Sequence, residues 1–339
     1  MRDRMNTAAE LIDPALPKIE LHLHIEGAAP PAFIRGLAKE KHIDIGGIFD
    51  EAGQYRYVDF WDFLKVYEAA CTTLQTPQDF ARLTSAVLEE SARDGVIYTE
   101  MFISPDFCGG GDLTAWREYL HAIQEAAAEA HRANGIEMRG IVTCVRHFGA
   151  EKARASALCA AETAGAFITG FGMGGDEKFG QPADFAWAFD CAREGGLRLT
   201  SHAGEWGGPE SVRATLDALK VERIGHGVRA IEDLALTEEL AERGVVLEVC
   251  PGSNVALGLY GDFAAHPVAR LRDRRVKLTL STDDPPFFRS SNVREYEALA
   301  RAFGWTAEDF LAINADAARA AFCDEATRQT LLSRLESAA

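Results

Sequence analysis

The segment Glu20-Leu21-His22-Leu23-His24 gives the first indication of the fold. Polar and apolar residues alternate along it as they do along a half-buried β-strand, which predicts that Glu20, His22 and His24 share one face. Two imidazoles at adjacent positions of one face are half of a metal site. A histidine pair on an apolar strand is more often structural than catalytic, so the interpretation depends on what the rest of the chain places beside it.

Three further polar clusters end short apolar runs downstream. They are SHAGE at 201–205, GHG at 225–227 and STDDP at 281–285. In a parallel α/β barrel the carboxyl ends of the strands converge at one mouth, so clusters far apart in sequence form one site. The pattern therefore indicates a single active site at a barrel mouth.

The chain alternates between short β-rich runs and amphipathic helical stretches, which is typical of parallel strands with helical crossovers. Its 339 residues are 47% hydrophobic, enough for a large core. We predict an α/β fold, a (β/α)8 TIM barrel that forms one catalytic domain over residues 1–339. The expected strands cover 18–24, 96–103, 137–145, 166–172, 197–202, 222–226, 244–250 and 276–282.

Two segments exceed what eight barrel units require. About seventy residues separate the first two expected strands, too many for one crossover helix, so 28–95 is predicted to be a helical lid insertion over the mouth. Residues 291–336 carry extra C-terminal helical stretches that pack around the barrel, and Thr306 with Asp309 resembles a capping box.

Composition limits the classes of partner. A net charge of -17 argues against nucleic acid and anionic membrane surfaces. Residues 1–17 contain no apolar region typical of a signal peptide and no run that spans a bilayer. The seven cysteines form no CxxC pair and indicate reduced, buried thiols. We expect a cytoplasmic enzyme that acts on a small molecule.

The polar clusters supply the ligand types of a catalytic zinc. Such a zinc takes imidazole nitrogens and carboxylate oxygens and keeps one position for water, whose pKa it lowers. His22, His24 and His202 offer three nitrogens, and Asp283 offers an oxygen. By itself, the pair Asp283-Asp284 would be typical of a turn or a helix cap. Because these four residues are expected to converge at one barrel mouth, we favour a site for one Zn²⁺ per chain.

Two further residues have chemistry that suits the same mouth. Glu205 follows His202 by three residues, so its carboxyl group is placed to transfer a proton between water and a substrate nitrogen. Its alternative role is a solvated turn residue. His226 lies between Gly225 and Gly227 and is placed to hydrogen-bond the attacking hydroxide, while the alternative role of the glycines is strand packing.

Together these motifs resemble the successive signatures of the adenosine and adenine deaminases of the amidohydrolase superfamily. The resemblance runs from about Pro17 to Phe322, and five ordered motifs are far more specific than one HxH pair. They are HLHIEG at 22–27, GDE at 175–177, HAGE at 202–205, RIGHG at 223–227 and STDDP at 281–285.

The resemblance implies hydrolytic deamination at purine C6. Protonation of N1 makes C6 electron-poor, hydroxide adds there and ammonia leaves to give the 6-oxopurine. The resemblance implies that the zinc ligands are His22, His24, His202 and Asp283. It implies three catalytic residues: Glu205, which acts at N1, His226, which acts at the hydroxide, and Asp283. The implied substrate-binding residues are His24, Glu26, Asp284, which binds N7, and Gly175, whose N–H binds N3.

The motifs give opposing indications about the substrate. Glu26 stands where many adenosine deaminases have an Asp that reaches the ribose, and in this it is similar to the adenine deaminases. Gly225 before His226 instead resembles the adenosine enzymes, and Trp206 after HAGE is unusual. We expect adenosine and 2'-deoxyadenosine; the alternative is adenine, an N6-substituted adenine or a modified adenine nucleoside such as 6-aminodeoxyfutalosine.

The lid segment holds several aromatic residues between 55 and 75. Apolar residues recur at helical spacing over 59–74, which predicts a helix there. Tyr57, Phe60, Trp61 and Phe63 are expected to close over the purine, with Phe60 and Phe63 in contact with it. The alternative is that they only pack the lid onto the barrel.

Two functions of other classes are alternatives to deamination. The first is a metal-dependent hydrolase that opens a cyclic amide on the same scaffold. A carbamylated lysine directly after the fourth strand would favour it, but Lys178 comes after Gly175-Asp176-Glu177, in an expected loop. An inactive nucleoside-binding protein is not favoured either, because every expected metal ligand and Glu205 are present.

Overall fold

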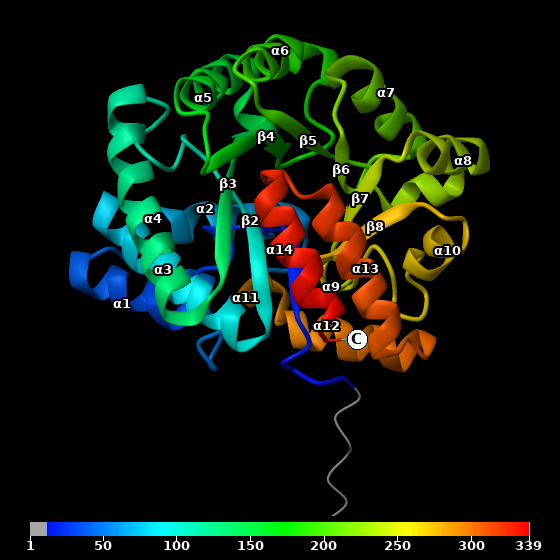
Figure 1. Cartoon of the computed structure of the whole chain (residues 1–339). Coiled ribbons are helices and arrows are strands. Elements are labelled where there is room, and N and C mark those ends of the chain that lie inside the picture. The colour runs from blue at the N-terminus through cyan, green and yellow to red at the C-terminus, as the bar shows by residue number, and fades with distance from the viewer. Residues whose placement is uncertain (1–11, 339) are drawn as a thin grey trace, which may run out of the picture.

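The computed structural model describes residues 12–338. Its strands are β1 (Lys18–His24), β2 (Val96–Ile103), β3 (Glu137–Val145), β4 (Ile168–Gly174), β5 (Arg198–Ala203), β6 (Arg223–His226), β7 (Val246–Val249) and β8 (Lys277–Leu280). All eight are parallel and follow one another in chain order around the sheet (Figure 1). The His24 N–H donates to the Asp283 carbonyl at 3.1 Å, which joins β1 to the end of β8. The predicted (β/α)8 barrel is confirmed.

The strand β1 departs from the regular alternation that its sequence predicts. Its register against β2 shifts between Glu20 and Leu23. Consequently His24 lines a cavity at the barrel mouth, whereas Glu20 lines a different cavity together with Leu23. The Glu20 carboxylate accepts hydrogen bonds from the N–H and the hydroxyl of Thr282, at 2.9 and 2.6 Å. The prediction that Glu20 shares a face with the two histidines was wrong, because one irregular position reverses the side-chain direction.

An outer ring of helices surrounds the strands. The helices are α3 (Pro77–Arg93), α4 (Leu113–Asn134), α5 (Ala150–Glu162), α6 (Ala186–Glu194), α7 (Pro209–Leu219), α8 (Leu234–Arg243) and α10 (Val268–Asp273). Short helices α9 (Pro251–Ala256) and α11 (Pro285–Phe288) follow β7 and β8. Among the helices of residues 12–338, none has the length and apolar composition required to cross a bilayer.

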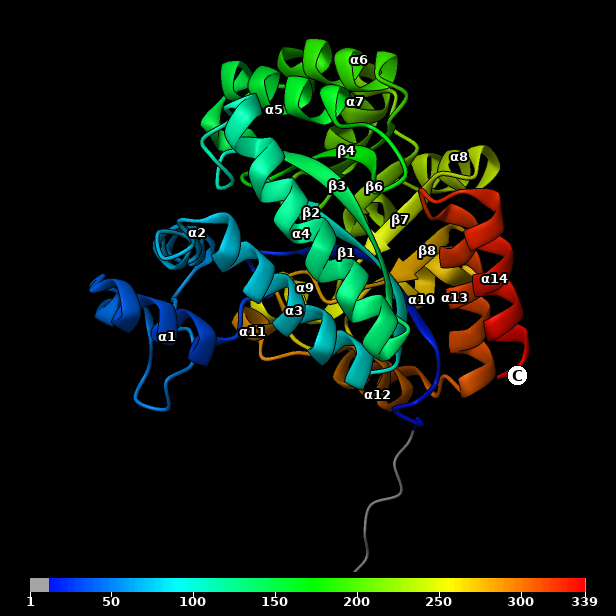
Figure 2. The ribbon, with the colours of Figure 1, turned by 60° about the vertical axis from the view of Figure 1, so that its left-hand side comes forward.

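The inserted segment divides into a lid part and a barrel part. Helices α1 (Pro31–Lys41) and α2 (Phe60–Cys71) lie on the side of the barrel opposite α13 (Ala307–Ala320) and α14 (Glu325–Glu336) (Figure 2). The third helix of the segment, α3, packs against α4 and β2 and so belongs to the outer ring. Within 28–95, α3 is thus the crossover helix between β1 and β2, which segment length alone does not separate from an insertion; a lid formed by the rest of the segment stays a prediction.

The C-terminal segment packs on the barrel beside the strands β1 and β8. It forms α12 (Asn292–Phe303), α13 (Ala307–Ala320) and α14 (Glu325–Glu336), with α13 against β1 and β8 and α14 against α13. The Thr306 N–H donates to the Asp309 carboxylate at 2.8 Å, as the sequence predicts. The extra C-terminal helices are confirmed as packing elements of the barrel.

A buried ion-pair network fills the barrel interior. The Arg223 guanidinium donates from Nη2 to Glu100 Oε2 and from Nε to Glu248 Oε1, both at 2.6 Å. All three side chains are inaccessible to solvent. The second oxygen of Glu248 lies 2.8 Å from Nδ1 of His22. The network therefore connects the interior of the barrel to its mouth.

Replacement of Arg223 tests how far the barrel depends on this network. We expect Arg223→Leu to lower the free energy of unfolding by about 3–5 kcal/mol, because it leaves the carboxylates of Glu100 and Glu248 buried without a partner. Urea unfolding measures the change. The control is Arg213→Leu, which removes a partly exposed arginine paired with Asp233 and should have a much smaller effect. Equal midpoints for the two variants would contradict the expectation.

Candidate active site

Four predicted metal ligands meet at the barrel mouth. Oδ1 of Asp283 lies 3.4 Å from Nε2 of His22 and 3.4 Å from Nε2 of His24. Nε2 of His24 lies 3.3 Å from Nε2 of His202. The residues come from β1, β5 and the segment after β8, so the structure brings together the set that the sequence predicted.

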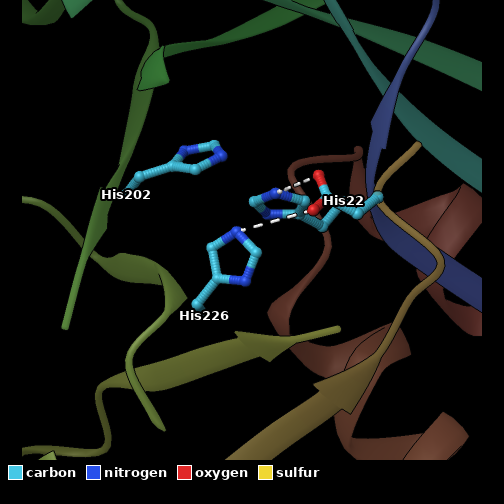
Figure 3. Close-up of side chains that lie close together, drawn as sticks. His22, His202 and His226 are labelled. Carbon is cyan, nitrogen blue, oxygen red and sulfur yellow. Dashed lines mark ion pairs between the residues drawn. The ribbon is translucent and has the colours of Figure 1, made fainter. Parts of the chain in front are cut away.

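A fifth donor, His226, lies beside these four. Its Nε2 is 3.8 Å from Oδ2 of Asp283 and 3.8 Å from Oε1 of Glu205. Donor atoms of His22, His202, His226 and Asp283 all lie within 4.8 Å of one another. Figure 3 shows the imidazole rings of His22, His202 and His226 turned toward one another. Distance alone therefore does not distinguish His226 from a ligand.

The hydrogen bonds behind two of the rings favour metal binding. His22 is paired through Nδ1 with Glu248, and Nδ1 of His202 lies 2.9 Å from the Met173 carbonyl. Both arrangements place the ring proton on Nδ1 and leave Nε2 free toward the centre, as in ligating histidines. Nε2 of His22 is buried and has no hydrogen-bond partner. This donor set of imidazole nitrogens and one carboxylate fits a catalytic zinc.

Backbone geometry at the strand ends turns these side chains inward. Asp283 and His226 have φ angles of 67° and 59°, in the left-handed region that non-glycine residues adopt at a cost of about 1–3 kcal/mol. Gly225 has a different constraint. A Cβ atom there would lie 2.9 Å from His22 Cε1 and 3.1 Å from His202 Nδ1. Gly225 is therefore required for the two imidazoles to approach each other.

Two carboxyl groups beside the donor cluster have unusual ionisation. Burial raises the pKa of Glu205 well above its ordinary value, and the charges of Asp283 and Glu177 raise it further. Burial likewise raises the pKa of Asp284, with added repulsion from Asp283 and Glu26. A raised pKa favours the protonated form of each carboxyl group, and that form can donate a hydrogen bond.

Glu177 has a structural role that the sequence analysis missed. Its buried carboxylate accepts hydrogen bonds from the backbone N–H groups of residues 204–207, at 2.6–3.0 Å. It also accepts from the Ser211 hydroxyl at 2.5 Å. These contacts fix the loop that carries Glu205. Its place in the GDE motif was the available signal, but only Gly175 was given a role there.

One cavity above the donor cluster contains almost all predicted site residues. Its walls include His24, Glu26, Phe60, Phe63, Gly175, His202, Glu205, His226, Asp283 and Asp284. The other predicted lid aromatics lie outside its lining: the Tyr57 hydroxyl donates to the Phe287 carbonyl at 3.1 Å, and Trp61 is exposed. Trp206 packs against Phe60, with 4.8 Å between ring centroids.

Two neighbouring residues of α2 attach the lid to the barrel across this cavity. The Tyr67 hydroxyl donates to Glu26 Oε2 at 3.3 Å. Oε1 of Glu68 lies 3.2 Å from Nε2 of His147, whose Nδ1 accepts the Asp176 N–H at 3.2 Å. No local pattern in the sequence indicates Glu68 or His147, because their partners are far apart in the chain.

Comparison with known proteins identifies the family of this chain. The family model described as adenosine deaminase matches residues 17–338. The chain belongs to the adenosine deaminase family. Family membership and the relatives below confirm the expectation of a hydrolase that deaminates purines.

Several named or solved proteins are similar to this chain. The adenine deaminase of Rhizobium leguminosarum bv. trifolii is 48% identical over 320 residues, which cover 94% of this chain and 99% of that protein. The crystal structure of adenine deaminase from Arthrobacter aurescens matches with a TM-score of 0.87 at 30% identity, covering 95% of this chain and 99% of that one. An amidohydrolase from Burkholderia ambifaria, solved with bound Zn, shares the fold with a TM-score of 0.81 at 24% identity, covering 96% and 92%.

Metal content tests the donor cluster of this adenosine deaminase family member. We expect purified protein to carry about one divalent transition metal per chain and Asp283→Ala to lose it together with turnover, because the variant lacks one ligand. Elemental analysis by mass spectrometry measures the metal. The control is His121→Ala, which changes an exposed histidine on α4. Asp283→Ala with undiminished metal content would refute the assignment.

Proposed function

We propose that this protein is a zinc-dependent adenine deaminase, which converts adenine and water to hypoxanthine and ammonia. The similar relatives from Rhizobium and Arthrobacter are both named adenine deaminase. Adenine is the alternative that the sequence left open, and these relatives support it better than adenosine. Its expected partner is a small purine base.

The environment of Glu26 is the observation that carries the choice of base over nucleoside. A preference for adenosine would follow if the Glu26 carboxylate bound the sugar hydroxyls, because a substrate without a sugar would then leave this carboxylate without a hydrogen-bond partner. Glu26 is instead buried and accepts hydrogen bonds from the Tyr67 hydroxyl and from the Ser104 N–H, both at 3.3 Å. Burial raises its pKa to about 7. Because the protein itself satisfies Glu26, a substrate without ribose leaves no unpaired carboxylate.

The second argument for a nucleoside also has a different explanation. Gly225 resembled the adenosine enzymes, but it lies against the imidazoles of His22 and His202. The packing of two proposed ligands therefore explains a glycine at this position without reference to a sugar in the substrate.

The residues proposed to hold zinc are His22, His24, His202 and Asp283. Zinc held by them would supply a Lewis acid that makes water a better nucleophile. The Ser253 hydroxyl donates to Oδ2 of Asp283 at 2.7 Å, which orients the carboxylate with Oδ1 toward His22 and His24.

The proposed chemistry depends on two protonated carboxyl groups. Glu205 donates its proton to purine N1, which draws electrons from C6 and prepares it for attack. Asp284 donates a hydrogen bond to N7; its Oδ1 is buried without a partner in the cavity wall. The Gly175 N–H binds N3, and His226 directs the nucleophile toward C6. Phe60 and Phe63 contact the base and exclude water.

Substrate preference is the direct test of the proposal. We expect kcat/KM for adenine to exceed that for adenosine by at least about tenfold, since the cavity satisfies Glu26 without a sugar. The ultraviolet absorbance change of 6-oxopurine formation measures both rates, and 2'-deoxyadenosine and N6-methyladenine complete the series. Faster turnover of adenosine than of adenine would reject the proposal.

The role of Glu205 can be separated from metal binding. Glu205→Gln is expected to retain zinc and to lower kcat by about 10²- to 10⁴-fold, because the amide can hydrogen-bond N1 but cannot deliver a proton. Steady-state kinetics and metal analysis measure the two effects. The exposed residue Glu210 provides the control variant Glu210→Gln. Near-normal kcat for Glu205→Gln would assign the proton to another group.

A further inference from the structure

A chain of hydrogen bonds lies behind His226 and begins at a backbone amide. The Val268 N–H lies 3.2 Å from Nδ1 of His266. Nε2 of His266 lies 3.1 Å from Oδ1 of Asn254, and Nδ2 of Asn254 lies 3.3 Å from Nδ1 of His226. The side chains of His226, Asn254 and His266 are all buried. The deamination mechanism described above uses neither Asn254 nor His266.

The backbone amide fixes the direction of every bond in this chain. A peptide N–H can only donate, so Nδ1 of His266 accepts. Burial lowers the pKa of His266 to about 3, helped by Arg270, so the ring is neutral and carries its one proton on Nε2. That proton is donated to Oδ1 of Asn254. The Asn254 amide then donates to Nδ1 of His226, which leaves the His226 proton on Nε2.

We propose that Asn254 and His266 are positioning residues that hold His226 as its Nε2–H tautomer. Nε2 of His226 faces Glu205 Oε1 and Asp283 Oδ2, each 3.8 Å away. A protonated Nε2 has no lone pair for a metal, so His226 is a hydrogen-bond donor to the nucleophile and not a fifth ligand. His22 and His202 have the opposite arrangement, since Glu248 and the Met173 carbonyl hold their protons on Nδ1.

This inference rests on the proposed deaminase function for its kinetic consequences, but the tautomer can be measured without turnover. Long-range ¹H–¹⁵N correlation spectra distinguish a protonated ring nitrogen from a bare one, and His226→Gln identifies the signal. We expect Nε2–H for His226 in the metal-loaded protein. A proton on Nδ1, or on both nitrogens at neutral pH, would overturn the proposal whatever the substrate is.

Two substitutions at Asn254 test the consequence for catalysis. Asn254→Leu removes the donor and is expected to lower kcat by about 10²-fold or more while KM for adenine and metal content change less than about threefold. Asn254→Asp restores a donor only when its carboxyl group is protonated. Its kcat should therefore exceed that of Asn254→Leu, and the excess should be greatest at low pH.

The controls separate positioning from folding. Asn134→Asp makes the same chemical change at an exposed position and should keep wild-type kinetics. Thermal unfolding confirms that each variant is folded. Wild-type kcat in folded Asn254→Leu, or equal kcat for Asn254→Leu and Asn254→Asp at every pH, would overturn the role of the Asn254 donor. If instead the wild type does not deaminate adenine, the proposed function fails while the tautomer measurement still stands.

Discussion

The ion pairs of Arg223 are the interaction on which the site geometry depends. Burial alone would raise the pKa of Glu248, but Arg223 and His22 outweigh it and hold that pKa at about 2. Glu248 is therefore ionised in the barrel interior, where it also accepts from the Thr200 hydroxyl at 2.8 Å. An ionised Glu248 orients His22 through Nδ1. The orientation of His22, a proposed metal ligand, thus depends on the ion pairs between Arg223, Glu100 and Glu248 in the barrel interior.

The surroundings of each imidazole give chemically identical side chains different roles. Hydrogen-bond acceptors at Nδ1 of His22 and His202 leave Nε2 of each ring without a proton. The Asn254 amide at Nδ1 of His226 is a donor, so the proton of His226 is on Nε2. All three rings lie within one small cluster of donor atoms. A list of nearby histidines therefore does not by itself give the number of ligands; on our proposal, the hydrogen bonds behind each ring distinguish a metal ligand from a hydrogen-bond donor.

The sequence predicted the barrel and the cluster at its mouth because both depend on local patterns. His24, His202 and Asp283 each end an apolar run, and parallel strands bring such ends together. The irregularity in β1 that turns Glu20 away arises from pairing with β2, which no local pattern records. The partners of Glu26 were equally hidden, since Tyr67 and Ser104 lie 41 and 78 positions away along the chain. The expectation of adenosine depended on such distant contacts, and the similar relatives support its alternative, adenine, better.

The two attachments of α2 have a consequence for the timing of turnover. Tyr67 and Glu68 are neighbours on one helix, yet they contact Glu26, after β1, and His147, after β3. Because α2 also contributes Phe60 and Phe63 to the cavity wall, movement of this helix away from the barrel breaks both contacts at once. On the proposed function, the base would enter and the products would leave through this one opening. Both contacts, together with the packing of the buried α2 residues Phe63 and Val66, oppose such an opening, whose rate is separate from the rate of the chemical step.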